Sequence, residues 1–194
     1  MMTAEEKEIV RLLTSESDVN EGFQKLLDAY QKPLYFFVRR LLICHDDTHD
    51  VLQDSFVRVL HGIHSFKGES QLSTWLHTIA YREALKHLKR KKKKVHVELN
   101  EEIWNYMEQL EDDIYYTGNR IQLILQACVT ALPDKQRAVF VMKYYEEKKY
   151  DEIAAITGTS VGALKASYHH AVEKIKVTLE KQKLEWNEYE TTKK

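Results

Sequence analysis

The residues between Asp151 and Ala171 have types and a spacing that suit recognition of DNA rather than covalent chemistry. A short apolar helix runs into Gly158, and a second helix with few acidic side chains follows. Ala154 is small where two helices would cross, Gly158 can adopt a positive φ in the turn, and Leu164 can reach back into a shared core. The spacing therefore predicts a helix-turn-helix, with a plain amphipathic hairpin as the alternative interpretation.

In a helix-turn-helix, the second helix lies in the major groove with its first side chains at base edges. We expect this recognition helix over residues 160–174. The candidates for contact with the duplex are Ser160, Lys165, Ser167, Tyr168, His169 and His170.

A second set of residues that suits nucleic acid lies on and before a long helix expected over residues 72–88. Between residues 67 and 94 there are nine Lys or Arg and only two acidic residues. Basic side chains three and four apart form a stripe that suits a phosphate backbone, and the aromatic side chains at its start could stack on unpaired bases. The candidates are Lys67, Trp75, His77, Tyr81, Arg82, Lys86, Lys89 and Arg90. A solvated charged face is the alternative.

An acidic stripe is expected on the helix over residues 46–64. Its apolar residues fill one face, while Asp47, Asp50, Gln53 and Asp54 gather elsewhere on its surface. Carboxylates near a helix N-terminus are also favourable without any partner, so a solvated face is the alternative.

Two histidines in this segment raise the question of a metal-dependent enzyme. His45 and His49 lie four residues apart, with Asp46, Asp47 and Asp50 nearby. No His-Glu-x-x-His arrangement follows, and the spacing places no third ligand. A nucleophile elbow and a Gly-rich phosphate loop are also missing. We expect no catalytic residue, metal, cofactor or small-molecule substrate, and keep the metal enzyme as an alternative class.

The composition sets the fold class. Only 6 Gly and 2 Pro occur in 194 residues, and apolar residues recur every three and four positions, which predicts an all-α fold. Residues 95–118 carry seven acidic and no basic side chains, so they indicate a connector between two helical domains. The expected divisions are a polar leader 1–22, a first domain 23–94, an acidic linker 95–118, a second domain 119–180 and a polar tail 181–194.

The cysteines and the hydropathy indicate a compartment. Cys44 and Cys128 have no partner spacing typical of a disulfide framework or a metal site. The N-terminus lacks an apolar signal core, and no apolar run approaches 18 residues. We therefore expect a cytoplasmic protein.

Taken in chain order, these segments resemble an extracytoplasmic-function (ECF) RNA polymerase sigma factor of the sigma-70 family. Residues 46–60 resemble the signature with which that family binds core polymerase. The segment with which that family melts the promoter and recognises the minus-ten element has similar sequence in residues 66–68, 72–76 and 79–80. The family domain that reads the minus-thirty-five element has similar sequence in residues 132–137, 150–154 and 158–169.

The resemblance implies two small helical domains, the first like sigma region 2 and the second like the helix-turn-helix region 4. It implies that the acidic stripe binds core RNA polymerase, that the basic stripe binds and melts the minus-ten region, and that residues 160–174 read the minus-thirty-five element of promoter DNA. It also implies an anti-sigma factor as a partner. Ser167 and His170 stand where many relatives carry Arg, Arg82 where many carry Asn, and Lys86 where Asp is common. A helix-turn-helix regulator that acts without core polymerase is the alternative function.

Overall fold

The computed structural model describes residues 2–92 and 120–192, and the expected acidic linker 95–118 lies outside them. Every regular element in these two stretches is helical, which confirms the all-α prediction for the described residues. The elements are α1 (Ala4–Leu13), α2 (Val19–Leu42), α3 (His45–Gly62), η1 (Ile63–Ser65), α4 (Leu72–Lys92), α6 (Arg120–Thr130), α7 (Asp134–Phe140), η2 (Val141–Tyr145), α8 (Tyr150–Thr157) and α9 (Val161–Thr192).

The first domain consists of α1 to α4. Helix α2 continues through Pro33 rather than ending there. Proline removes one helix hydrogen bond, but Pro33 is exposed, while Leu34, Phe37 and Val38 beside it are almost completely buried. Packing of this apolar face therefore outweighs the local cost of the proline.

The N-terminal segment, expected as a polar leader, begins with a helix that packs on α2. Ile9, Leu12 and Leu13 of α1 are at most 3% exposed. A Cβ on Gly22 of α2 would come within 2.7 Å of the Leu13 nitrogen, so the two helices approach this closely only because residue 22 is glycine. The expected division at residue 22 thus falls within a packed helical pair.

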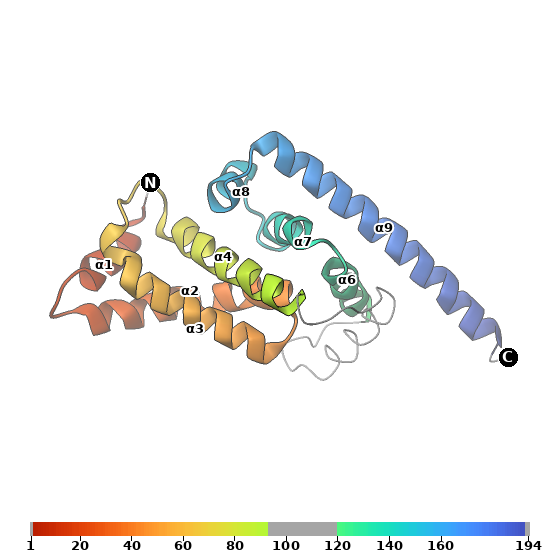
Figure 1. Cartoon of the computed structure of the whole chain (residues 1–194), viewed down its shortest axis with the longest axis horizontal. Coiled ribbons are helices and arrows are strands. Elements are labelled where there is room, and N and C mark those ends of the chain that lie inside the picture. The colour runs from red at the N-terminus through yellow and green to blue at the C-terminus, as the bar shows by residue number, and fades with distance from the viewer. Residues whose placement is uncertain (1, 93–119, 193–194) are drawn as a thin grey trace.

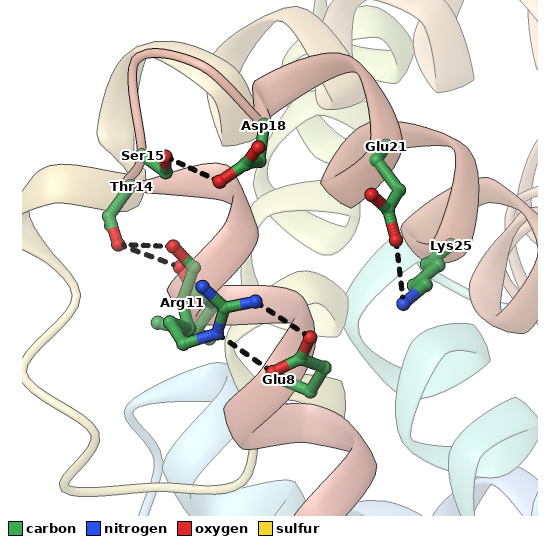
Figure 2. A network of polar contacts seen from close by, with 8 residues as sticks. Glu8, Arg11, Thr14, Ser15, Asp18, Glu21 and Lys25 are labelled. Carbon is green, nitrogen blue, oxygen red and sulfur yellow. Dashed lines mark hydrogen bonds and ion pairs between the residues drawn. The ribbon is translucent and has the colours of Figure 1, made fainter.

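Polar contacts cover the outer edge of this pair, as Figure 2 shows. Arg11 pairs with Glu8, Ser15 donates to Asp18 across the connection, and Lys25 pairs with Glu21. Exposed pairs of this kind contribute about 1 kcal/mol or less. The buried leucines and Gly22 therefore hold α1 in place.

The junction between α2 and α3 is a strained turn. Ile43 has φ 68° and ψ −45°, and the Cys44 N–H donates to the Leu42 carbonyl at 2.8 Å, which is the rarer form of γ-turn. A buried β-branched residue in this conformation costs about 1–3 kcal/mol. The strain is tolerated because the side chain of Ile43 is 2% exposed and packs in the core.

The second domain consists of α6 to α9, and its helix-turn-helix has the expected form. Gly158 ends α8 with φ 69°, in the left-handed region, and its N–H donates to the Ala154 carbonyl at 2.9 Å. Leu164 of α9 is 1% exposed, so it does reach into the core. Helix α9 is a single helix of 32 residues that extends past α6 in Figure 1.

The two domains lie side by side, with α8 near α4 in Figure 1. Arg137 of α7 is 7% exposed, and its Nη1 donates to the Leu41 carbonyl of α2 at 2.6 Å. Its Nη2 donates to the carbonyls of Thr130 and Leu132 at the end of α6. One guanidinium therefore satisfies the C-terminal carbonyls of two helices from different domains.

Two further contacts join the domains. The guanidinium of Arg40 on α2 lies 4.4 Å from the ring centroid of Tyr145. His77 of α4 lies 3.2 Å from Glu146, measured from Nε2 to Oε2, and Lys148 is 3.4 Å from the same oxygen. A shallow groove beside these contacts is lined by Pro33, Phe36, Arg40, His77, Tyr145, Glu146 and Lys148.

We predict that Arg137→Met lowers the free energy of unfolding by about 1–3 kcal/mol, because carbonyls of α2 and α6 lose their buried donor. Lys135→Met, on an exposed neighbour in the same helix, is the control and should change it by less than about 0.5 kcal/mol. Urea unfolding measures both variants. Equal stability of the two would show that Arg137 does not anchor the fold.

Candidate nucleic-acid and protein interfaces

The basic stripe of α4 faces solvent along most of its length. Arg82, Lys86, Lys89 and Arg90 are exposed, and Lys67 is exposed in the connection before α4. Arg90 contacts His87 at 3.2 Å, and Lys86 lies 3.4 Å from Glu83. The stripe therefore presents several cations that a phosphate backbone could reach.

An aromatic pair lies at the start of α4. The rings of Trp75 and Phe66 are 5.0 Å apart between centroids with an interplanar angle of 34°, and both residues are half-buried. Gly62 packs beside the indole, and a Cβ there would lie 3.4 Å from it. The ring of Trp75 is thus held in a defined position beside the basic stripe.

His77 and Tyr81, which the sequence analysis assigned to the same stripe, lie on a different face of α4. They are 5% and 7% exposed. His77 contacts the Ser73 carbonyl at 2.8 Å as well as Glu146. Burial, with a smaller effect of Asp134, raises the pKa of Tyr81.

The helical geometry explains this difference. Each residue turns a helix by about 100°, so Tyr81 lies about 100° and His77 about 140° around the helix from Arg82. The sequence-based assignment placed His77 and Tyr81 with the basic residues because of their residue types alone. In this closed arrangement, His77 and Tyr81 face the second domain.

Glu83 was not singled out by the sequence analysis. It is 8% exposed on α4 and lies 2.5 Å from Arg58 of α3, measured from Oε1 to Nε. Its other oxygen faces Lys86. This buried carboxylate joins α3 to α4 and neutralises part of the basic stripe.

The acidic stripe of α3 is exposed except at its first residue. Asp50, Gln53 and Asp54 are exposed, and Val57 continues the same face with an exposed fraction of 47%. An exposed valine beside three polar residues adds apolar area to a docking surface. Val57 could not be identified from the sequence, because the helical pattern alone does not separate a boundary residue from a core residue.

Asp47 makes its contacts within the first domain. Its carboxylate pairs with Lys91 of α4, and its Oδ1 lies 3.2 Å from Nε2 of His87. Partial burial alone would raise the pKa of Asp47, but Lys91 and His87 together hold it below its ordinary value of 3.8. Asp47 therefore links α3 to α4, and Asp50, Gln53 and Asp54 remain open to a partner.

In the helix-turn-helix, several polar side chains at the start and along the first half of α9 face solvent. Ser160, Lys165, His169 and His170 are exposed, and Ser167 is half-buried. The Ser160 hydroxyl accepts a 3.4 Å hydrogen bond from the Ala163 N–H at the helix start. These side chains could reach base edges or phosphates.

Tyr168 is half-buried and packs one face of its ring against the second domain. Its ring stacks on Phe140 at 5.7 Å with an interplanar angle of 17°, and burial together with Tyr150 and Tyr144 raises its pKa. Lys165 lies 5.9 Å from the ring centroid of Tyr150. Tyr168 therefore fixes the orientation of α9.

The structure offers no metal site in the ranges that it describes. The rings of His45 and His49 are 4.4 Å apart, and Nδ1 of His45 contacts the Tyr35 hydroxyl at 2.9 Å. No group of three or more His, Cys, Asp or Glu residues suited to a metal occurs in residues 2–92 and 120–192. Over the same ranges, none of the helices combines the length and apolar character needed to cross a membrane.

Comparisons with known protein families match both domains. The family profile described as Sigma-70 region 2 matches residues 26–94. The profile described as Sigma-70, region 4 matches residues 122–175. Together these two matches cover more than half of the chain, in the order of the two domains.

Curated relatives resemble the chain over most of its length. The ECF RNA polymerase sigma factor SigW of Bacillus subtilis is 28% identical over 167 residues, covering 82% of this chain and 89% of the relative. The ECF RNA polymerase sigma-E factor of Haemophilus influenzae is 26% identical over 165 residues, covering 80% and 86%.

Two solved structures share the fold. The sigma factor RpoE of Bartonella quintana, in complex with the anti-sigma factor NepR, has a TM-score of 0.62 and 20% identity, covering 81% of this chain and 96% of that one. CnrH, in complex with the cytosolic domain of CnrY, has a TM-score of 0.66 and 19% identity, covering 91% and 97%.

The Asp47 pairing predicts a loss of stability in acid. A carboxylate whose folded pKa is depressed stabilises the fold above its ordinary pKa, and this contribution is lost as the pH falls through the folded value. Asp47→Asn should therefore flatten the fall in stability below about pH 4, whereas the exposed Asp46→Asn should not. Urea unfolding over this range tests it. An NMR titration midpoint of Asp47 at or above 3.8 would contradict it.

Proposed function

Because the chain belongs to the sigma-70 family, in its ECF branch, we propose that it is an alternative sigma factor: it binds core RNA polymerase and directs promoter recognition, strand opening and transcription initiation. The observation that carries this proposal is the presence of region 2 and region 4 in order on two packed helical domains. The chain itself catalyses no step, and it works in the cytoplasm beside the polymerase. The domain limits 23–94 and 119–180 remain predictions.

We assign the exposed face of α3 to docking on core polymerase. Asp50, Gln53 and Asp54 would meet a basic surface, and the half-exposed Val57 would add apolar contact. Charge complementarity across such an interface sets the encounter rate and the register more than the affinity. Asp47 supports this face by holding α3 against α4.

We assign the exposed stripe of α4 to the minus-ten region. Arg82, Lys86, Lys89 and Arg90 would follow the phosphates of the separated strand, and Trp75 would stack on an unpaired base. Stacking of this kind contributes about 1–3 kcal/mol per base, which offsets unpairing without covalent chemistry.

We assign the exposed polar side chains of α9 to the minus-thirty-five element. Ser160 and Lys165 lie near its start, where a recognition helix contacts base edges. His169 follows one turn after Lys165 on the same side of the helix, and His170 is exposed farther around it. Tyr168 positions the helix from within the domain.

The two DNA-reading surfaces cannot act together in the closed arrangement. Elements named for positions ten and thirty-five are about 25 base pairs apart, which is about 80 Å along a duplex that rises about 34–36 Å per turn. Helix α8 packs directly on α4. The domains must therefore separate on the promoter.

We also propose an anti-sigma factor as a partner. Closure buries His77 and Tyr81 of α4, and a protein that favours the closed arrangement would keep the two promoter-reading surfaces from acting together. The alternative function, a helix-turn-helix regulator without core polymerase, predicts tight duplex binding by the chain alone. The acidic α3 face has no role in that alternative.

Run-off transcription on genomic fragments, with core polymerase and the chain together, tests the proposal. We expect promoter-specific transcripts that core enzyme alone does not produce. Asp50→Lys with Asp54→Lys should weaken core binding about tenfold or more, because both carboxylates are exposed and oppose a basic surface. Glu16→Lys with Asp28→Lys is the control, since it changes net charge equally at exposed positions on α2 and the α1–α2 connection. An absence of initiation on every fragment would refute the function.

Domain separation gives a second prediction. Spin labels are attached at His64→Cys on η1 and Lys176→Cys on α9, and the native cysteines are removed by Cys44→Ser and Cys128→Ala. In the free chain, the distance between the two labels should form one short population. Core polymerase should shift it to a longer distance, since the two promoter elements lie far apart. An unchanged distance in the holoenzyme would contradict separation.

A further inference from the structure

A buried carboxylate joins the N-terminal helix to the start of α4. Glu6 of α1 is 5% exposed, although its neighbours Ala4 and Glu5 are exposed. Its Oε1 accepts hydrogen bonds from the Ser73 N–H and from the Tyr30 hydroxyl, each at 3.2 Å. Its side chain therefore reaches two elements outside its own helix.

The other oxygen of Glu6 fixes the carboxylate in place. Oε2 accepts a 2.9 Å hydrogen bond from the Thr3 N–H, and the Thr3 hydroxyl accepts one from the Glu6 N–H at 3.1 Å. This capping box uses the same side chain that contacts α4. Burial, with Glu6 as the second cause, raises the pKa of Tyr30, so the tyrosine stays a donor.

Ser73 is the second residue of α4, and the first N–H groups of a helix have no partner within it. Glu6 supplies that missing acceptor, and its negative charge lies at the positive end of the helix dipole. Trp75 follows two residues later. The direction in which α4 leaves the connection thus depends on a side chain 67 positions earlier in the sequence.

The N-terminal segment contacts the connection before α4 as well. Gly68 has φ 71°, and a Cβ built on it would lie 3.4 Å from the Met2 side chain. Met2 and Glu6 therefore flank the stretch from Gly68 to Ser73. This stretch separates Lys67 from Trp75, which were both predicted from the sequence as candidates for the minus-ten region.

We propose that Glu6 is a positioning residue for minus-ten recognition: it sets the orientation of α4 and Trp75 toward the separated strand. The inference rests on the proposed function and assigns a role to a residue that lies before residue 26, where the region 2 match begins. Glu6 touches no nucleic acid itself. Its effect passes through the Ser73 N–H to the helix.

The test compares Glu6→Gln with Glu5→Gln, an exposed neighbour in the same helical turn. An amide cannot accept all three hydrogen bonds and carries no negative charge at the start of α4, so NMR should show faster amide exchange at Ser73 in Glu6→Gln only. Holoenzyme with this variant should bind a single-stranded oligonucleotide of the minus-ten non-template strand about tenfold more weakly. The strand is taken from a promoter recovered by run-off transcription. Affinity for core polymerase should stay unchanged.

Two more variants separate positioning from loss of stability. Tyr30→Phe removes one donor and should shift oligonucleotide affinity in the same direction by less. Ile9→Val shortens a buried side chain of α1 without touching Ser73, and should leave that affinity unchanged. An equal loss in Ile9→Val, an equal loss of core binding in Glu6→Gln, or full oligonucleotide affinity in Glu6→Gln would overturn the inference. Failure of the wild-type holoenzyme to initiate would overturn the proposed function itself.

Discussion

The arrangement of the two domains depends on one buried cation at the converging C-termini of two helices. Helices α2 and α6 each end with carbonyls that have no intrahelical donor and with the negative end of a helix dipole. The Arg137 guanidinium donates to the Leu41 carbonyl near the end of α2 and to the Thr130 and Leu132 carbonyls at and just after the end of α6. Gln126 adds a weaker hydrogen bond to the Arg40 carbonyl. The second domain therefore completes the end of a helix that belongs to the first.

The contact between α2 and α7 leaves α4 with one side facing the second domain and one side facing solvent. With α2 and α7 joined, α8 lies against α4 and His77 and Tyr81 are buried, while the side with Arg82, Lys86 and Lys89 stays in solvent. The same helix thus takes part in domain closure and presents cations. Separation of the domains would uncover His77 and Tyr81 beside the basic stripe. The sequence assigned His77, Tyr81 and the basic residues to one nucleic-acid surface. In the open chain this whole surface would be accessible, whereas the closed chain exposes only the basic residues.

Local patterns were enough to predict the all-α class, the helix-turn-helix and the family, but the N-terminal segment was expected as a polar leader and contains the packed helix α1. Gly158 in a positive φ and Leu164 in the core follow directly from spacing, since a turn and a helix crossing restrict both positions. Contacts between distant segments could not be predicted in this way. The pairing of Asp47 with Lys91, the reach of Glu6 to Ser73 and the γ-turn at Ile43 depend on how whole helices pack. No local pattern distinguishes a carboxylate that meets a cation across the fold from one that meets water.

The chemistry of the domain contact also explains how closure can be reversible. Glu146 forms a largely buried polar cluster with His77 and Lys148, and the cost of removing the Glu146 and Lys148 charges from water offsets most of their attraction. Such a cluster fixes the register of two surfaces while adding little net stability. The Arg137 hydrogen bond to the Leu41 carbonyl can also be exchanged, because water can replace the donor at this carbonyl once the domains part. A partner with comparable contacts for each separated domain can therefore open the chain without unfolding either one. Interfaces between domains of one chain commonly have this transient character.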